Sequence, residues 1–277
     1  MIEKQIREYL LPRAFNAAVR AGADIMRVYA DSDDYDIELK RDNTPLTVAD
    51  RLAHNKIKEV LGETRIPILS EEGREMLYDE RKNWEMFWLV DPLDGTIEFI
   101  NGNHEFTVNI ALMANNECVG SVVYVPYLQK LYFAEQGGGA SLLTDIAPDE
   151  KACYTIEEIR SRAQSLPLEN SSHDGFRVAV SRSHQTIETA EYVERMRAQH
   201  PNIEVIEQGS SYKFCLMAEG NIDYYPRTTE TYEWDTAAAE LILVESGGLV
   251  RSLPDHRPLR YNKSDLHNPW FECHRFK

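Results

Sequence analysis

The chain has 277 residues, of which 43% are hydrophobic and 27% charged, a composition typical of a folded protein with a sizeable core. Its 46 acidic and 30 basic residues give a formal net charge of −16, which repels DNA, RNA and anionic membranes and excludes nucleic-acid polymers as expected partners. No apolar stretch approaches the ~20 residues of a membrane span, and the first residues lack the apolar segment of a signal peptide. We therefore expect a cytoplasmic protein with no transmembrane segment; peripheral membrane association and the oligomeric state stay open.

The N-terminal part of the chain is expected to be helical. Apolar residues over 6–28 recur at the three- and four-residue spacing of an amphipathic helix, and Pro12 is expected to interrupt it. Residues 42–45, Asp-Asn-Thr-Pro, are typical of a turn. A second helix is expected after Thr47, an N-cap residue with Asp50 at the third helical position.

The hydrophobic period then changes to that of strands. Residues 66–69 and 87–90 form short apolar runs that end in carboxylates, as buried strands do when they deliver side chains to a site. Three segments that alternate or are rich in β-branched residues predict an antiparallel meander: 105–113, 117–126 and 129–134. We expect this meander to end at the glycines 137–139.

The second half of the chain alternates helices with strands. Residues 144–175 contain prolines and a polar run and are interpreted as a surface excursion between two units; we assign no role to 168–175. Strands are then expected at 177–180, 203–206 and 222–225, and helices at 185–198, 212–220 and 235–246. The order of elements predicts an α/β (α+β) fold with two subdomains, 1–145 and 146–277.

Three groups of carboxylates follow apolar elements: Glu71 with Glu72, Asp91 with Asp94, and Asp235. Carboxylates that converge from strand ends and a helix start repel one another unless a cation lies between them. Oxygen ligands alone favour magnesium, manganese or calcium over zinc. For any one acid taken singly, a helix cap or a solvent-exposed position is the favoured interpretation.

The Asp94-Gly95-Thr96 turn favours the metal interpretation. It follows a strand and precedes an expected helix, so the amides of Gly95 and Thr96 form an anion site at a helix N-terminus. A phosphate held there by two cations about 3.5–4 Å apart has the geometry of metal-assisted hydrolysis. The spacing D-P-L-D-G-T differs from the D-x-D-G-T of enzymes that form an aspartyl-phosphate, so we expect direct attack by water.

Four motifs in order resemble those of the inositol monophosphatase superfamily. Residues 88–96 with Glu98 and Phe99 resemble its first signature, and 234–248 resemble its second. Residues 47–50 and 70–72 match two further positions. The resemblance implies a layered αβαβα sandwich of the inositol monophosphatase and fructose-1,6-bisphosphatase type, with an N-terminal metal-binding and a C-terminal substrate-binding subdomain.

Within that superfamily the chain is most similar to the bacterial-type 3'(2'),5'-bisphosphate nucleotidases. These enzymes hydrolyse the 3'-phosphate of adenosine 3',5'-bisphosphate, a by-product of sulfate assimilation, to AMP and phosphate. The likeness rests on the segments 105–112, 181–184, 209–220, 225–227, 259–263 and 268–270. Ile97 stands where this subgroup usually has a lysine, which removes a cation from the phosphate site.

The resemblance implies a role for each matched residue. The expected metal ligands are Glu71, Asp91, the Leu93 carbonyl, Asp94 and Asp235, with two or three Mg²⁺ ions, Mn²⁺ as a substitute and Li⁺ as an inhibitor. Thr96 is expected to orient the attacking water, Glu71 to draw its proton and Asp50 to hold Thr96. The expected substrate contacts are Gly95, Thr96, Ser181, His184, Ser210, Lys213, Arg227 and Asp235.

Other interpretations stay open at this point. From the residues alone, Lys213 and Arg227 also suit surface ion pairs, and His184 suits a helix start. The same chemistry can act on inositol 1-phosphate or a sugar phosphate, because only 181–227 point to a nucleotide. A non-catalytic sensor of the nucleotide is a third possibility, but such a protein need not keep both Glu71 and Thr96 beside the metal ligands.

Overall fold

Two helices cover one face of a large sheet. The computed structural model describes residues 4–31, 37–40, 45–169, 174–200, 202–253 and 255–275. Helix α1 (Lys4–Ala30) packs against α2 (Val48–Gly62). Two short strands, β1 (Glu38–Leu39) and β2 (Pro45–Leu46), lie between the two helices in the sequence. As predicted, Thr47 is the N-cap of α2, and the Asp50 carboxylate closes the capping box. The expected turn at 42–45 falls largely outside the described residues.

Helix α1 is continuous, so the predicted interruption at Pro12 is wrong. Pro12 has no N–H to donate to the carbonyl four residues earlier. The neighbouring carbonyl, that of Tyr9, accepts a hydrogen bond of 2.8 Å from the Arg13 guanidinium. Buried residues on one face of α1, Ala14, Ala18 and Ile25 among them, pack on the sheet, and this packing outweighs the cost of the proline.

The large sheet has seven strands in the order β3-β4-β5-β6-β7-β8-β9. They are β3 (Ile68–Ser70), β4 (Met86–Asp94), β5 (Thr107–Ala114), β6 (Glu117–Val125), β7 (Lys130–Glu135), β8 (Gly139–Leu143) and β9 (Gln164–Ser165). Only β3 and β4 pair in parallel within this sheet, and the predicted antiparallel meander is confirmed as β5, β6 and β7. Short helices α3 (Tyr78–Arg81) and α4 (Thr96–Ile100) flank β4.

The meander was expected to end at the glycines 137–139, and this prediction is wrong. Gly137 and Gly139 take left-handed backbone angles in a tight turn, and β8 starts at Gly139 and pairs with β7. The expected surface excursion likewise contains α5 (Ile156–Arg162), which packs on α1, and β9, which joins this sheet. The subdomain boundary at 145/146 stays a prediction. Part of the unassigned stretch 168–175, residues 170–173, lies outside the described residues.

A second sheet of five strands lies across the molecule in the order β11-β10-β12-β14-β13. Its strands are β10 (Phe176–Ser181), β11 (Ile203–Gln208), β12 (Tyr224–Arg227), β13 (Leu249–Ser252) and β14 (Phe271–His274). Strands β10, β11 and β12 run parallel, and the last two, which the sequence did not reveal, add antiparallel partners. The predicted alternation is confirmed by α6 (Ile187–Gln199), α7 (Tyr212–Glu219) and α8 (Glu233–Glu245).

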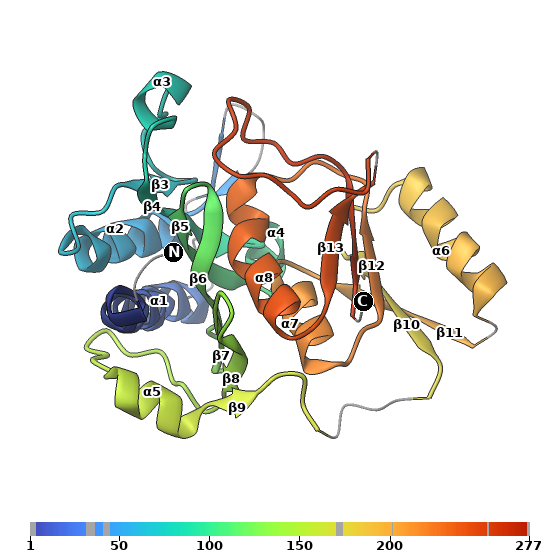
Figure 1. Cartoon of the computed structure of the whole chain (residues 1–277), viewed down its shortest axis with the longest axis horizontal. Helices are drawn as coiled ribbons and strands as arrows, with labels where there is room; N and C mark the ends of the chain where they lie inside the picture. Colours follow the sequence, from blue (N-terminus) through green and yellow to red (C-terminus); the bar gives the residue numbers. More distant parts are fainter. Residues whose placement is uncertain are drawn as a thin grey trace.

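The layers stack as helix, sheet, helix, sheet, helix, which confirms the expected αβαβα sandwich. Figure 1 shows α1 and α2 on the outer side of the large sheet, α7 and α8 between the two sheets, and α6 beyond the second. Three clusters of buried apolar residues fill the spaces between layers, as this order requires. Within the described ranges no helix combines the length and apolarity needed to cross a bilayer.

Candidate active site

A pocket of about 390 Å³ opens where five elements end or begin. Its walls come from the end of β4, the start of α4, the end of β10, the start of α7 and the loop between β12 and α8. The predicted residues that line it are Glu71, Asp91, Leu93, Asp94, Gly95, Thr96, Ser181, His184, Ser210, Lys213, Arg227 and Asp235. The structure therefore brings into one cavity every predicted site residue except Asp50.

A bulge in β4 directs Asp91 and Asp94 to the same side. Asp91 pairs with Asn109 and Asp94 with Thr107, so β4 advances three residues while β5 advances two. In a regular strand, residues three apart point to opposite faces. The extra residue resets this alternation, and both carboxylates line the pocket.

Glu71 enters the pocket from the neighbouring strand. It follows β3, and its N–H donates to the Val90 carbonyl over 3.1 Å, which sets it beside the end of β4. The Lys40 ammonium donates to Glu71 Oε1 over 2.6 Å and also contacts Glu72. Lys40 is a partner of the site that the sequence analysis did not identify.

Asp235 comes from the opposite side of the pocket, in the first turn of α8. Its carboxylate accepts a hydrogen bond of 2.9 Å from the N–H of Tyr232, the N-cap of that helix. This bond satisfies one of the free amides at the helix start and orients the carboxylate.

The four acids are electrostatically unfavourable as a group. Burial, followed by the charges of Glu71, Asp94 and Asp235, raises the pKa of Asp91 well above its usual value. Burial and the charges of Asp94 and Glu71 do the same to the pKa of Asp235. Burial also raises the pKa of Glu71, although Lys40 opposes this shift. Converging buried carboxylates of this kind fit a hard divalent cation, which neutralises them.

The carboxylates are engaged with protein donors in this structure. Asp94 Oδ2 accepts from the Ser211 N–H over 2.6 Å and from Asn109 Nδ2 over 3.2 Å, and Lys40 holds Glu71. Accordingly, among the described residues no three His, Cys, Asp or Glu side chains are already set around a metal position. The fit to a cation therefore rests on donor chemistry and charge.

Thr96, which lines the pocket, pairs with Asp50, which does not. Thr96 Oγ1 lies 3.2 Å from Asp50 Oδ1 and 3.3 Å from the Leu93 carbonyl oxygen, so its proton has two acceptors. Asp50 is buried, and its other oxygen accepts from the N–H and hydroxyl of Thr47. Gly95 begins α4 with φ = 90°, and a Cβ there would lie 3.2 Å from both the Glu105 carbonyl oxygen and Ser210 Cβ.

Lys213 and Arg227 supply cationic side chains to the pocket, and His184 lies at its rim. Lys213 is buried, with Nζ donating to the carbonyls of Ser210 (2.7 Å) and Gln208 (3.0 Å), so it is not a surface ion-pair residue. Burial, reinforced by Arg227, lowers the pKa of Lys213 to about 8. His184 stands exposed at the rim, where partial desolvation and Arg227 lower its pKa.

Besides Lys40, three further polar partners of the site were missed by the sequence analysis: Ser211, Asn109 and Glu98. Ser211 and Asn109 hold Asp94, and buried Glu98 lines the pocket and accepts from Ser183 Oγ over 2.5 Å. All three lie in segments whose likeness to the nucleotidases was noted, or beside the Asp-Gly-Thr turn. Their place in these segments is the sequence feature that could have marked them as site residues. It does not show which partner each side chain contacts.

Comparison with known proteins agrees with this site. Residues 7–269 match the model of the inositol monophosphatase family. The chain belongs to this family. The 3'(2'),5'-bisphosphate nucleotidase CysQ of Salmonella typhimurium is 39% identical over 243 residues, which cover 87% of this chain and 89% of the relative. The corresponding CysQ of Haemophilus influenzae is 33% identical, with coverage of 96% and 93%.

A solved structure of the family has the same fold. The crystal structure of CysQ from Bacteroides thetaiotaomicron, described as a bacterial member of the family, superposes with a TM-score of 0.88 at 44% identity and covers 99% of this chain and 98% of its own. The resemblance inferred from the motifs is thus confirmed. Membership of the family makes the chain a phosphatase that depends on a divalent metal ion.

Proposed function

We propose that the chain is a magnesium-dependent 3'(2'),5'-bisphosphate nucleotidase that converts adenosine 3',5'-bisphosphate to AMP and phosphate. The observation that carries the proposal is that one pocket contains both the carboxylate cluster and two cationic side chains, Lys213 and Arg227. A substrate with two phosphates needs both kinds of group. The curated relatives named for this activity support the choice. A role in sulfur metabolism and a cytoplasmic location belong to the same proposal.

The proposed metal ligands are the carboxylates of Glu71, Asp91, Asp94 and Asp235 and the carbonyl of Leu93. We propose two or three Mg²⁺ ions, with Mn²⁺ able to substitute and Li⁺ able to inhibit. When bound, divalent cations neutralise phosphate charge and make a water molecule a stronger nucleophile.

The protein's own groups position and deprotonate that water. The Thr96 proton is held by Asp50 or Leu93, which leaves lone pairs of Oγ1 free to accept a hydrogen bond from the water. Glu71 takes the proton, because burial raises its pKa and makes it a better base than an exposed glutamate. The water oxygen joins phosphorus as the bond to the ribose 3' oxygen breaks; that oxygen takes a proton from a solvent water, and Glu71 returns the proton it took to solvent.

The other groups hold the two ends of the substrate. The amides of Gly95 and Thr96 are proposed to bind the phosphate that is cleaved, and Lys213, Arg227 and His184 to bind the second phosphate. Ser181 and Ser210, which line the same pocket, add neutral hydrogen-bonding groups. Ile97 also lines it and adds no charge there.

The test is phosphate release with Mg²⁺ from adenosine 3',5'-bisphosphate, 5'-AMP, inositol 1-phosphate and fructose 1,6-bisphosphate. We expect the bisphosphate nucleotide to give the highest kcat/KM, with 5'-AMP as the product. If inositol 1-phosphate or the sugar bisphosphate is preferred, the phosphatase site stands and the nucleotide assignment falls. The pocket-lining Ile97 is the residue that would then explain the altered preference.

A further inference from the structure

We infer that Glu233 and Lys263 are positioning residues for Asp235 and that they set the affinity of the site for divalent cations. The inference rests on the proposed function, in which Asp235 is a metal ligand. It concerns the segment 259–268, which includes residues 259–263 and Asn268, where likeness to the nucleotidases was noted, and which takes no part in the pocket lining described above.

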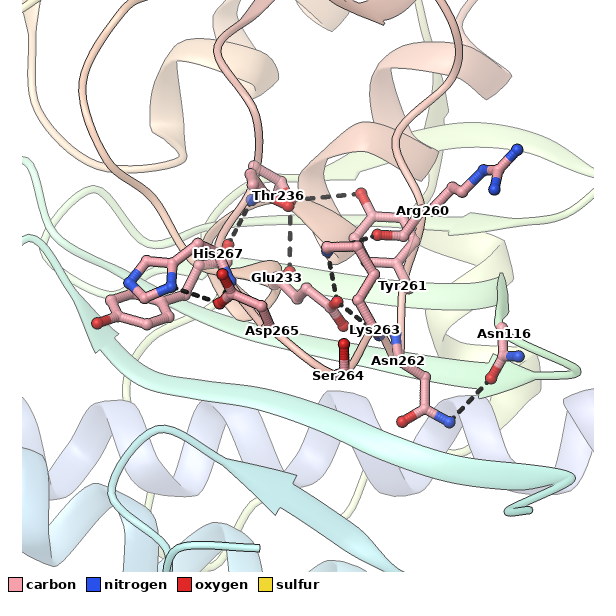
Figure 2. A network of polar contacts seen from close by, with 12 residues as sticks. Asn116, Glu233, Thr236, Arg260, Tyr261, Asn262, Lys263, Ser264, Asp265 and His267 are labelled. Atoms are coloured by element: carbon pink, nitrogen blue, oxygen red, sulfur yellow. Dashed lines mark hydrogen bonds and ion pairs between the residues drawn. The ribbon is translucent and has the colours of Figure 1, made fainter. Parts of the chain in front are cut away.

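Glu233 is a fully buried carboxylate, two residues before Asp235 in the first turn of α8. It accepts hydrogen bonds from the N–H groups of Asn262 (2.6 Å) and Lys263 (3.0 Å) and from the Lys263 ammonium. Figure 2 shows Glu233 directed toward Lys263 and Asn262, in the middle of the network. All three bonds join the start of α8 to one short stretch of chain.

The same stretch holds that turn at two more points. The Glu233 N–H donates to the Leu266 carbonyl over 3.0 Å. Asn268 Nδ2 donates to the Tyr232 carbonyl (2.6 Å) and to Thr236 Oγ1 (3.1 Å). Segment 259–268 thus contacts the first turn of α8 on both sides of Asp235, at Tyr232 and Glu233 before it and at Thr236 after it.

Asn262 connects this segment to the other half of the site. It accepts from the buried Arg81 guanidinium over 2.8 Å and donates to Asn116 Oδ1 over 2.9 Å, a contact drawn in Figure 2. Arg81 ends α3, and Asn116 lies in the turn between β5 and β6. The start of α8 is therefore attached to the large sheet, whose strand β4 supplies Asp91 and Asp94.

A buried ion pair is a costly way to attach two segments. Desolvation of the charges often cancels their attraction, so apolar residues of similar size stabilise a fold as well or better. An ion pair with two amide hydrogen bonds does restrict geometry more tightly than apolar contact. Since the metal ligands come from separate elements, cation affinity depends on how firmly Asp235 is held relative to Asp91 and Asp94.

The experiment measures binding of Mn²⁺ alone, from the paramagnetic resonance of the free ion, to the full-length protein and its variants. We expect K263M to raise the Kd for Mn²⁺ by about tenfold, which is the lower end of the effect of removing a residue that orients a metal ligand. The Kd of K263R should stay near that of wild type. The matched control is K130M. Lys130 donates to buried Glu219 over 2.7 Å, and the two ion pairs are buried to a similar extent. Both lysine side chains are 27% exposed, and the glutamates are 4% exposed (Glu219) and 0% exposed (Glu233). Neither Lys130 nor Glu219 lines the pocket, so K130M should bind Mn²⁺ as wild type does.

Thermal unfolding shows whether each variant is folded. If K263M does not fold, N268A removes the second attachment and should weaken binding in the same way. An unchanged Kd in the folded variant, or equal weakening in K130M, overturns the inference. Wild-type protein that binds Mn²⁺ but does not hydrolyse the nucleotide overturns the substrate proposal, and the Kd values still decide the role of Lys263. Wild-type protein that binds no Mn²⁺ overturns both the metal site and this inference.

Discussion

Lys213 shows how burial changes the chemistry of a single residue. Its ammonium is buried and bonded to two carbonyls, and the nearest cation, that of Arg227, adds repulsion. Its pKa is therefore about 8, so the charged form, which is proposed to bind phosphate, is lost as the pH rises through that value. We expect kcat/KM for the nucleotide to fall by about 10- to 30-fold between its low-pH value and pH 9.5, because a hydrogen bond to a charged group contributes about 1.5–3 kcal/mol and only about one molecule in 30 keeps the charge at that pH.

The control for this prediction is K213R, because arginine keeps its charge throughout the range. K213R should abolish the decline, and K213M should show the reduced value at every pH. A wild-type profile that K213M leaves unchanged in shape would assign the titration to another group. The measurement is kcat/KM at saturating Mg²⁺ between about pH 6.5 and 9.5.

Asp94 tests whether the site is catalytic or only binds. In D94N the amide oxygen can still accept from the Ser211 N–H, and repulsion of Asp91 and Asp235 is relieved, so in the absence of divalent cations the variant should unfold no earlier than wild type. Turnover should fall by about 10³-fold, because a metal's contribution is worth several kcal/mol and each 1.36 kcal/mol is about tenfold. A sensor without catalysis would release no phosphate in either form.

At the scale of elements, two carboxylates of the large-sheet half hold the nucleotide side of the pocket. Glu105 forms two hydrogen bonds with Arg182, of 2.7 and 2.9 Å, and accepts from the Gly209 N–H over 2.7 Å. Glu98 accepts from Ser183. These contacts set the strand ends that precede His184 and Ser210.

Gly209 is where this arrangement leaves no room for a side chain. A Cβ there would lie 2.3 Å from Glu98 Cγ and 3.2 Å from Glu105 Cβ. G209A should therefore displace the pocket wall, lower the free energy of unfolding by about 1–3 kcal/mol and raise KM for the nucleotide by ~10-fold. G62A is the control, since its Cβ meets nothing within 4 Å. A G209A enzyme with wild-type KM would show that this wall does not touch the substrate.

Most helices and strands could be predicted from the sequence, and each miss has a physical cause. Local patterns predicted most elements: the amphipathic period of α1 reflects burial of one helix face, and the apolar, β-branched runs of β5 to β7 reflect burial of both faces of these strands. The predicted helix break at Pro12 was wrong because tertiary packing outweighed the local cost of the proline. Strands β13 and β14 were missed because only their partners in the sheet stabilise such short strands. The motifs indicated which acids share a pocket; the contacts of Lys40 and Ser211 depend on chain segments far away in the sequence.

The whole molecule carries a net charge of −16 and is proposed to bind a polyanion. The cationic side chains in the pocket offset part of this charge, and the carboxylate cluster adds to it locally. Divalent cations, when bound, would neutralise the carboxylate cluster where the phosphate is proposed to be cleaved. The five layers serve this arrangement, because the acids come from the large sheet and from α8, and Lys213 comes from α7.

Cation binding should therefore stabilise the entire fold, and by more as the pH rises. The pKa values of Asp91 and Asp235 are raised in the folded protein, so the metal-free fold keeps these protons more tightly than the unfolded chain does. The metal-free protein therefore loses stability as the pH rises through those raised values. A cation must displace the same protons, so its advantage grows over that range. At 100 times its Kd, Mg²⁺ should add about 2.7 kcal/mol, or roughly 5 °C in Tm for a chain of this size.

The measurement is Tm with Mg²⁺ and with EDTA at about pH 5.5 and about pH 7.5, with sodium chloride at equal ionic strength to account for screening of the net charge. The difference between Mg²⁺ and EDTA should be larger at the higher pH and should shrink in D94N, which lacks one ligand. Equal stabilisation at both pH values, or stabilisation by sodium chloride alone, would mean that general screening rather than the carboxylate cluster is responsible. In that case the raised pKa values of Asp91 and Asp235 would not be linked to cation binding.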